Sequence, residues 1–173
     1  MEKKITTPIT KGLIIALVGA VLDLIAGFAH IKYETWWRWI PGIITFGLII
    51  WACLNYASQM ENNVTFGNIF AHGFKTSAVV VCFSIIYFLI SVYLIFPETK
   101  DITLQMTREQ MEKDPKYTQE VIDNAVDMTR RLFIPFALIG IVFFYLIFGS
   151  IASLIGAAVA KKNPVTPFDK PQA

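Results

Sequence analysis

Four long apolar segments are the feature that most constrains this chain. They cover residues 12–31, 36–57, 76–96 and 132–160. A helix rises about 1.5 Å per residue, so roughly 20 apolar residues cross the hydrocarbon core of a bilayer. The mean hydropathy of +0.55 is also well above that of an ordinary soluble domain. The sequence therefore predicts an all-α integral membrane protein with four transmembrane helices in two hairpins, forming a single membrane domain over residues 1–163.

Aromatic residues gather near the ends of these segments and are the predicted interface anchors. They are Trp36, Trp37, Trp39, Phe66, Phe70 and Phe74. Such rings concentrate at the headgroup level of membrane helices. The three phenylalanines recur at helical spacing within residues 65–75, which predicts a short interfacial helix. This helix either lies on the membrane surface or runs straight into the third span.

The connection between the third and fourth spans, residues 97–131, holds eight acids and six bases. We expect a water-exposed helical segment here, with Asp114 as an N-cap and Pro115 at the first helical position. An apolar stripe at helical spacing then leads into the fourth span. The stripe consists of Tyr117, Val121, Ala125, Met128 and Leu132. The last residues, 164–173, form a polar tail that we expect to be disordered.

Asp23 lies in the middle of the first span and needs an explanation, because an ionised Asp at a helix centre costs roughly 2.5–3.5 kcal/mol on insertion scales. No Lys or Arg lies at a comparable depth, which favours a protonated or hydrogen-bonded carboxyl over an ion pair. Polar side chains of other spans, such as Asn55, Thr45 and Ser84, are the available partners. Asp23, Asn55 and His30 are therefore the candidate intramembrane polar site, either as a proton or cation site or as a polar clasp between helices.

Small residues mark two predicted helix-packing faces, because small side chains let membrane helices approach closely. The first face consists of Ala16, Gly19, Ala20 and Gly27, and the second of Gly149, Ser153, Gly156 and Ala157. The second face is expected to meet either the first span or another copy of the protein.

Several functional classes are disfavoured by composition and motifs. The formal net charge is only +2 and the basic residues are scattered, so nucleic acid is not an expected partner. No catalytic motif is present, and Cys53, Cys82 and His72 have no second ligand at metal-binding spacing. We therefore expect no enzymatic activity, no catalytic residues, no metal and no cofactor.

Basic residues near the first span give a preferred orientation. Lys3, Lys4 and Lys11 precede it, whereas Lys32 and Arg38 follow it. By the positive-inside rule this slight excess places both termini in the cytoplasm.

Residues 64–75, VTFGNIFAHGFK, at the entry to an apolar span resemble a recurrent stretch in a domain-of-unknown-function family of small four-span bacterial membrane proteins. The overall layout agrees: a short basic N-terminus, two hairpins and a polar connection before the last span. The resemblance implies a bacterial inner-membrane protein with cytoplasmic termini, and it implies no activity.

The expected function is that of a non-enzymatic accessory subunit or scaffold of a membrane complex, which contacts the bilayer and other membrane proteins or itself. Its contacts are expected to use the small-residue faces and residues 97–131. The alternative is a small transporter, or a proton- or cation-coupled component, that uses Asp23.

Overall fold

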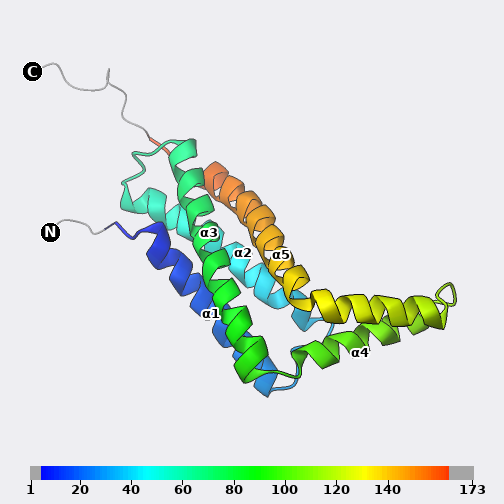
Figure 1. Cartoon of the computed structure of the whole chain (residues 1–173). Coiled ribbons are helices and arrows are strands. Elements are labelled where there is room, and N and C mark those ends of the chain that lie inside the picture. The colour runs from blue at the N-terminus through cyan, green and yellow to red at the C-terminus, as the bar shows by residue number, and fades with distance from the viewer. Residues whose placement is uncertain (1–4, 164–173) are drawn as a thin grey trace, which may run out of the picture. The chain divides into compact units, whose positions relative to one another are not determined.

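The computed structural model describes residues 5–163, so the predicted polar tail lies outside the described residues. The elements are α1 (Pro8–Phe28), a 3-10 turn η1 (Trp37–Trp39), α2 (Ile40–Gln59), α3 (Phe66–Ile90), a π-helical stretch η2 (Ser91–Ile95), α4 (Thr99–Glu112) and α5 (Gln119–Val159) (Figure 1). No strand occurs within residues 5–163. The all-α prediction is therefore confirmed.

Four helical stretches are long and apolar enough to cross a membrane. They are Pro8–Phe28, Trp37–Gln59, Phe66–Ile95 and Gln119–Val159. The short helix predicted for residues 65–75 is the first part of α3, which continues without a break into the third span. The first helix begins at Pro8 rather than at residue 12, because Thr7 caps it and Pro8 suits its first position.

The chain divides into two compact units. The first unit is Met1–Ser84 together with Val142–Ala173, and the second is Ile85–Ile141. Thus α3 and α5 each contribute to both units, and each unit is described separately below.

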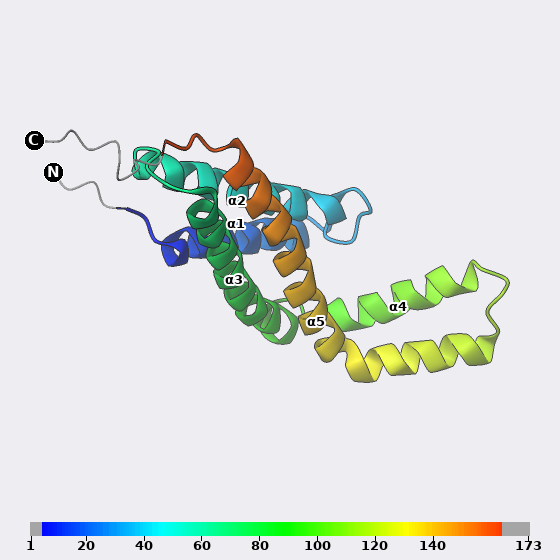
Figure 2. The same ribbon diagram turned by 90° about the horizontal axis from the view of Figure 1, so that it is seen from above.

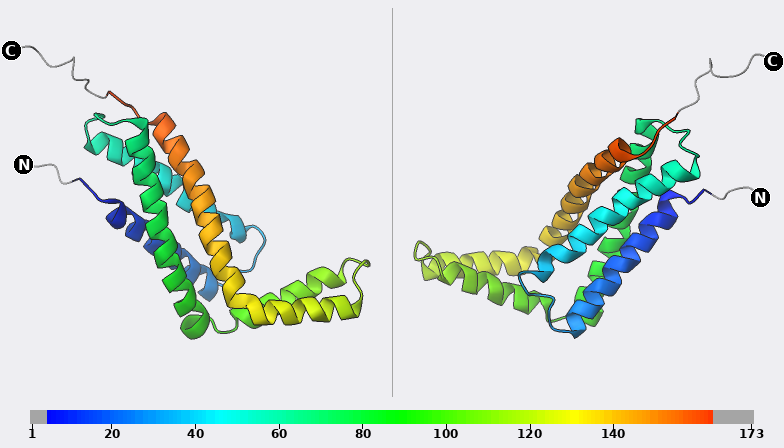
Figure 3. Two further views of the ribbon diagram at one scale, coloured as in Figure 1. Left: turned by 45° about the horizontal axis from the view of Figure 1, so that its top comes forward. Right: turned by 180° about the vertical axis from the view of Figure 1, so that it is seen from behind.

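In the first unit, α1 packs beside α2 (Figure 3). Thr6 donates from its backbone N and its hydroxyl to Oε1 of Gln59, both at 2.9 Å, which places the start of α1 beside the end of α2. The backbone N of Asn163 donates to the carbonyl of Asn62 at 2.8 Å. Both ends of the described chain therefore lie at the same end of this unit, as an even number of spans requires.

His30 and Asn62 belong to two similar turns that end α1 and α2. His30 has a left-handed backbone (φ 59°), and the next backbone N, of Ile31, donates to the carbonyl of Ala26 at 3.0 Å. Asn62 (φ 62°) likewise donates from its backbone N to Ala57 at 2.8 Å. These contacts satisfy carbonyls that a helix end leaves free. The side chain of His30 is exposed, and the left-handed backbone of this residue forms the turn that ends α1.

The small-residue face of α5 is buried inside the first unit. A Cβ added to Gly156 would lie 2.6 Å from Cβ of Cys53 on α2, and one added to Gly149 would lie 2.5 Å from Cβ of Ser77 on α3. Ser153 and Ala157 are fully buried. The expectation that this face meets the first span or another copy is wrong: it packs on α2 and α3, whose own small residues provide the matching close approach.

The predicted small-residue face of α1 is less closely packed than expected. A Cβ added to Gly19 would meet nothing within 4 Å, and Ala16, Ala20 and Gly27 are only partly buried. The close approach occurs at Gly12, where an added Cβ would lie 2.6 Å from Cβ of Val79 on α3. α1 therefore contacts α3 through its first turns.

The second unit contains a helical hairpin in which α4 lies beside the first part of α5 (Figure 2). Its seam consists of Leu104, Ile122 and Val126, with Met111 packed against them. An ion pair of 2.7 Å between Arg108 and Asp123 links the two helices at the surface.

Two details of this hairpin differ from the predictions. Asp114 is not the N-cap of a helix: its Oδ1 accepts a hydrogen bond from the backbone N of Lys116 at 3.1 Å within a turn. Helix α5 begins at Gln119, because α4 extends to Glu112 and a helix starting at Pro115 would leave only two residues to reverse the chain.

The buried side of α5 in this unit also differs from the predicted stripe. Ile122, Val126 and Phe133 are buried, whereas Tyr117, Val121, Met128 and Leu132 are exposed. The apolar arc of α5 is wide enough for both sets. Ile122 and Val126 pack on α4, and the ring of Phe133 lies beside that of Phe88 on α3.

Candidate functional site

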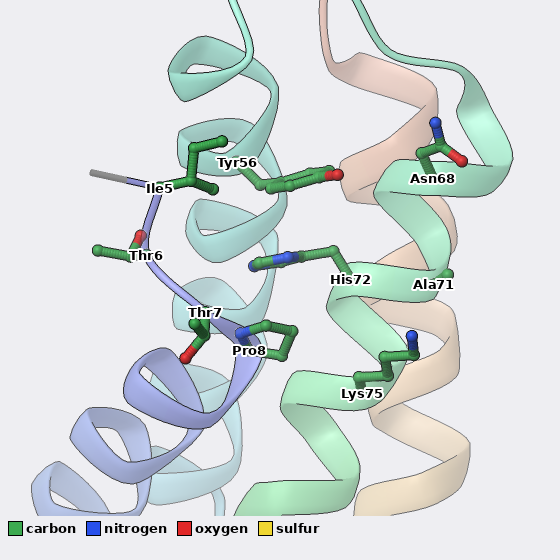
Figure 4. A pocket seen from close by; sticks show the side chains of 9 residues that line it. All are labelled: Ile5, Thr6, Thr7, Pro8, Tyr56, Asn68, Ala71, His72 and Lys75. Atoms are coloured by element: carbon green, nitrogen blue, oxygen red, sulfur yellow. The ribbon is translucent and has the colours of Figure 1, made fainter. Parts of the chain in front are cut away.

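A cavity of about 450 Å³ opens at the end of the first unit where the described chain begins. We call it the α1 cavity. Its lining residues come from the start of α1, from α2 and from the first turns of α3 (Figure 4). They are Ile5, Thr6, Thr7, Pro8, Tyr56, Asn68, Ala71, His72 and Lys75.

His72 is the most unusual lining residue. Its side chain is only 6% exposed, and its Nε2 atom has no hydrogen-bond partner among the described residues. The imidazole extends from α3 toward Thr6 and Pro8 at the mouth of α1 (Figure 4). It stacks on the ring of Tyr56, with ring centres 4.1 Å apart and planes inclined by 12°. A buried polar atom without a partner costs free energy, so this nitrogen is available for a ligand.

Lys11 brings a buried charge close to the same aromatic ring. It is 2% exposed and its Nζ donates to the backbone carbonyl of Ala52 at 3.0 Å. The same nitrogen lies 6.0 Å from the centre of the Tyr56 ring, within the range of a cation–π contact. No acid among residues 5–163 forms an ion pair with Lys11. A buried ammonium held only by a carbonyl and a ring is an unusual use of lysine inside an apolar helix.

The start of α1 explains how these groups come together. The Thr7 hydroxyl accepts a hydrogen bond from the backbone N of Thr10 at 3.2 Å, and Pro8 fixes the first helical residue. This cap places Lys11 within the first turns, on the same side as buried Ile15. Lys11 therefore points toward α2 instead of extending into water.

Asp23 occupies a second polar position, and it forms an ion pair. Its Oδ2 lies 3.0 Å from Nζ of Lys32, and both side chains are partly buried. The expectation of a hydrogen-bonded or protonated carboxyl in preference to an ion pair is wrong. His30 in the left-handed region reverses the chain at the end of α1. The side chain of Lys32 therefore extends back along α1 as far as Asp23, more than one helical turn from the end of the helix.

The other predicted partners of Asp23 have hydrogen-bond partners of their own. Thr45 and Ser84 form side-chain hydrogen bonds with Tyr145. Asn55 accepts at Oδ1 from Nε2 of Gln59 at 2.8 Å, near the start of α1. Because α1 and α2 run in opposite directions, Asn55 and Asp23 are roughly 20 Å apart along the helices. The structure therefore does not unite Asp23, His30 and Asn55 in one site.

The predicted interface anchors lie at both ends of the first unit. Trp36 and Trp39 are exposed, as are Phe66 and Phe74, while Trp37 and Phe70 are half-buried. Trp39 also lines an apolar cavity of about 470 Å³ with Phe144 and Phe148.

The second unit carries a separate candidate surface, which we call the hairpin face. It consists of Tyr117, Val121, Ala125, Met128 and Leu132. All but Ala125, which is half-buried, are exposed large apolar residues. Tyr117 lies in the turn before α5, and the others lie on one side of α5, away from the seam with α4. Within the second unit, the seam with α4 uses other residues and leaves this surface uncovered.

Sequence reasoning missed Lys11, Tyr56 and His72 as a group. The sequence presents Lys11 as a basic residue flanking the span and His72 as a histidine without a second metal ligand. A usable signal was present at Thr7 and Pro8, because an N-cap followed by proline starts the helix before Lys11 and places the lysine inside it. Among residues 5–163, no three His, Cys, Asp or Glu side chains could hold a metal ion.

The four spanning helices define a multi-pass membrane protein. Residues 10–162 match the family described as "Protein of unknown function (DUF4199)", so the chain belongs to this family. The predicted resemblance to a domain-of-unknown-function family is thereby confirmed. Neither the curated proteins nor the solved structures contain a match to the chain.

Proposed function

We propose that this protein is a non-enzymatic accessory subunit of a membrane complex and that the hairpin face binds its partner. The observation that carries the proposal is the uncovered row of large apolar side chains on α5. Burying apolar area contributes roughly 25 cal/mol per Å², so a partner that covers this row gains affinity from it.

The spacing of the hairpin face favours a helix as the partner. Val121, Ala125, Met128 and Leu132 follow one another at intervals of four, three and four residues. This alternation is the seam of a two-helix contact, in which each side chain fits between residues of the facing helix. A partner helix with its own apolar seam therefore fits this face.

Charge beside the seam favours a different chain over a second copy. The polar positions next to the seam are Asn124, Thr129 and Arg131, of which only Arg131 is charged. A second copy would bring no carboxylate to Arg131 at these positions, whereas a partner with an acid beside its seam would pair with it.

The small-residue face of α5 is excluded as a partner surface, because α2 and α3 already cover it. Of the two kinds of partner surface expected from the sequence, the small-residue faces and residues 97–131, we therefore assign partner binding to the second unit.

For location we propose the inner membrane of a bacterium with both termini in the cytoplasm, which puts the hairpin unit outside. The excess of basic residues before the first span supports this orientation. A reporter tag fused to either terminus, followed by labelling with a membrane-impermeant reagent specific for that tag, tests the orientation. Labelling of a terminus from outside would contradict it.

The alternative of proton or cation transport through Asp23 is less well supported. An ammonium 3.0 Å from the carboxylate occupies the position that a transported cation would need. The transport reading predicts ion flux in proteoliposomes that disappears in Asp23→Asn, whereas a polar clasp predicts no such flux.

Native mass spectrometry of the full chain, gently extracted from its own membrane, tests the accessory-subunit proposal. We expect the wild type to carry a larger partner and Val121→Glu/Met128→Glu to lose at least nine-tenths of it, because two carboxylates cannot be buried in an apolar seam.

The matched control is Gln110→Glu/Gln119→Glu, which adds the same charge to exposed positions of the hairpin outside the hairpin face. This variant should retain the partner. A wild-type monomer without partners, or a dimer of this chain alone, would contradict the accessory-subunit proposal.

A further inference from the structure

We propose that the α1 cavity binds a phosphate group, which the start of α1, Lys75 and His72 hold together. This inference goes beyond the docking role of the hairpin face and uses residues of the first unit only. Nothing in the family match assigns a ligand to these residues.

The start of α1 supplies the first element of the site. A helix of 21 residues begins at Pro8, on the wall of the cavity. The N-terminus of such a helix carries a partial positive charge, and it is a common place for phosphate to bind. Pro8 has no N–H, and the N–H groups of Thr10 and Lys11 donate to Thr7, so the N–H of Ile9 is the donor that the first turn offers a ligand.

His72 supplies an independent observation that a ligand belongs there. Its Nε2 is buried within the cavity wall, points toward the start of α1 and has no partner among the described residues (Figure 4). Stacking on Tyr56 fixes the imidazole plane, so this nitrogen is held ready for an acceptor placed between α3 and α1. A phosphate oxygen there would satisfy it.

The local charge is positive and unbalanced. Lys75 lines the cavity and Lys11 is buried near Tyr56, yet neither forms an ion pair with an acid in the described part of the chain. None of the lining residues is acidic. An anion in the cavity would therefore meet one ammonium directly and a second at longer range, with no opposing carboxylate on the wall.

The position of the cavity matches the depth of lipid phosphates. Pro8, Gln59 and Phe66 are the end residues of three candidate spans, and all belong to the end of the unit at which the cavity opens. Lipid headgroups lie at this level of a bilayer. The phosphate group therefore comes either from a lipid headgroup or from a free phosphate compound in the adjoining water.

Binding to the full chain in detergent tests the proposal, with two probes. Inorganic phosphate is titrated calorimetrically against chloride of equal ionic strength. Phosphatidylglycerol is compared with diacylglycerol of the same acyl chains, which lacks the phosphate, by native mass spectrometry. We expect Lys75→Met and His72→Ala each to weaken phosphate-dependent binding at least tenfold, since each removes a hydrogen bond to a charged group.

Lys161→Met is the matched control, because Lys161 is an exposed lysine beyond α5 at the same end of the unit and does not line the cavity. It should leave binding unchanged. Thermal unfolding of each variant checks the fold; if His72→Ala unfolds, Lys75→Met still tests the site, because that side chain is exposed.

Each outcome bears on the proposal. Binding of both phosphate-containing probes supports the site, binding of the lipid alone assigns it to a headgroup, and binding of inorganic phosphate alone assigns it to a soluble compound. Absence of binding by both probes, equal binding of the two lipids, or binding that survives Lys75→Met would overturn it.

Discussion

Gly156→Leu is expected to lower the free energy of unfolding by about 3 kcal/mol, the upper part of the range for overpacked interiors. Even the first carbon of the new side chain would lie 2.6 Å from Cβ of Cys53 and 3.4 Å from Cα of Ile50. The clash at Cβ of Cys53 cannot be relieved by a rotamer change, because the backbone fixes the position of a Cβ. α5 must therefore separate from α2, and the contacts around Cys53, Ala57 and Ala157 would be lost with it.

Reversible unfolding of the full chain in mixed micelles measures this effect. Gly47→Leu is the control, because Gly47 is an exposed glycine of α2 with nothing within 4 Å of an added Cβ. We expect it to be neutral or slightly stabilising, since glycine is a poor helix former. Equal stability of the two variants would show that α5 does not pack on α2 as described.

Lys32→Met is expected to lower the free energy of unfolding by about 1–2 kcal/mol. The change removes the ammonium 3.0 Å from Asp23 and leaves a carboxylate inside a membrane-spanning helix. Breaking a fully buried pair costs about 3–5 kcal/mol, but this pair is partly exposed and the smaller value applies.

The double variant Asp23→Asn/Lys32→Met distinguishes loss of the Asp23–Lys32 ion pair from any other destabilising effect of the substitution. Because it removes both charges, we expect it to recover most of the stability lost in Lys32→Met, and the same mixed-micelle unfolding gives the coupling free energy. Additive losses in the two single variants would argue against the ion pair as a stabilising contact.

The local sequence was sufficient to predict the spans because their signal is local. Roughly 20 apolar residues in succession must satisfy their backbone within one helix when lipid surrounds them, whatever else the chain does. The spacing of the phenylalanines also predicted a helix at the start of α3, whereas the stripe predicted for α5 is not the side that packs on α4. The start of α5 at Gln119 did not follow from spacing, since it depends on where α4 ends.

The candidate sites depended on distances across the fold. Lys32 follows the span in sequence, and only the turn at His30 returns it to Asp23. His72 and Lys11 are far apart in sequence, and the packing of α1 and α3 on α2 brings both to Tyr56.

By itself, the sequence determined that this protein is all-helical, that four helices can cross a membrane, and which residues on each helix are small, apolar or charged. Helical periodicity and the cost of exposed backbone in lipid fix those properties one segment at a time. The tertiary structure alone decided which face meets which neighbour. It buried the small residues of α5 against α2 and α3, left the hairpin face uncovered by α4, and buried Lys11 and His72 beside the ring of Tyr56. A helix with a wide apolar arc can pack in several ways with similar local energy, and only the contacts among all the helices select one.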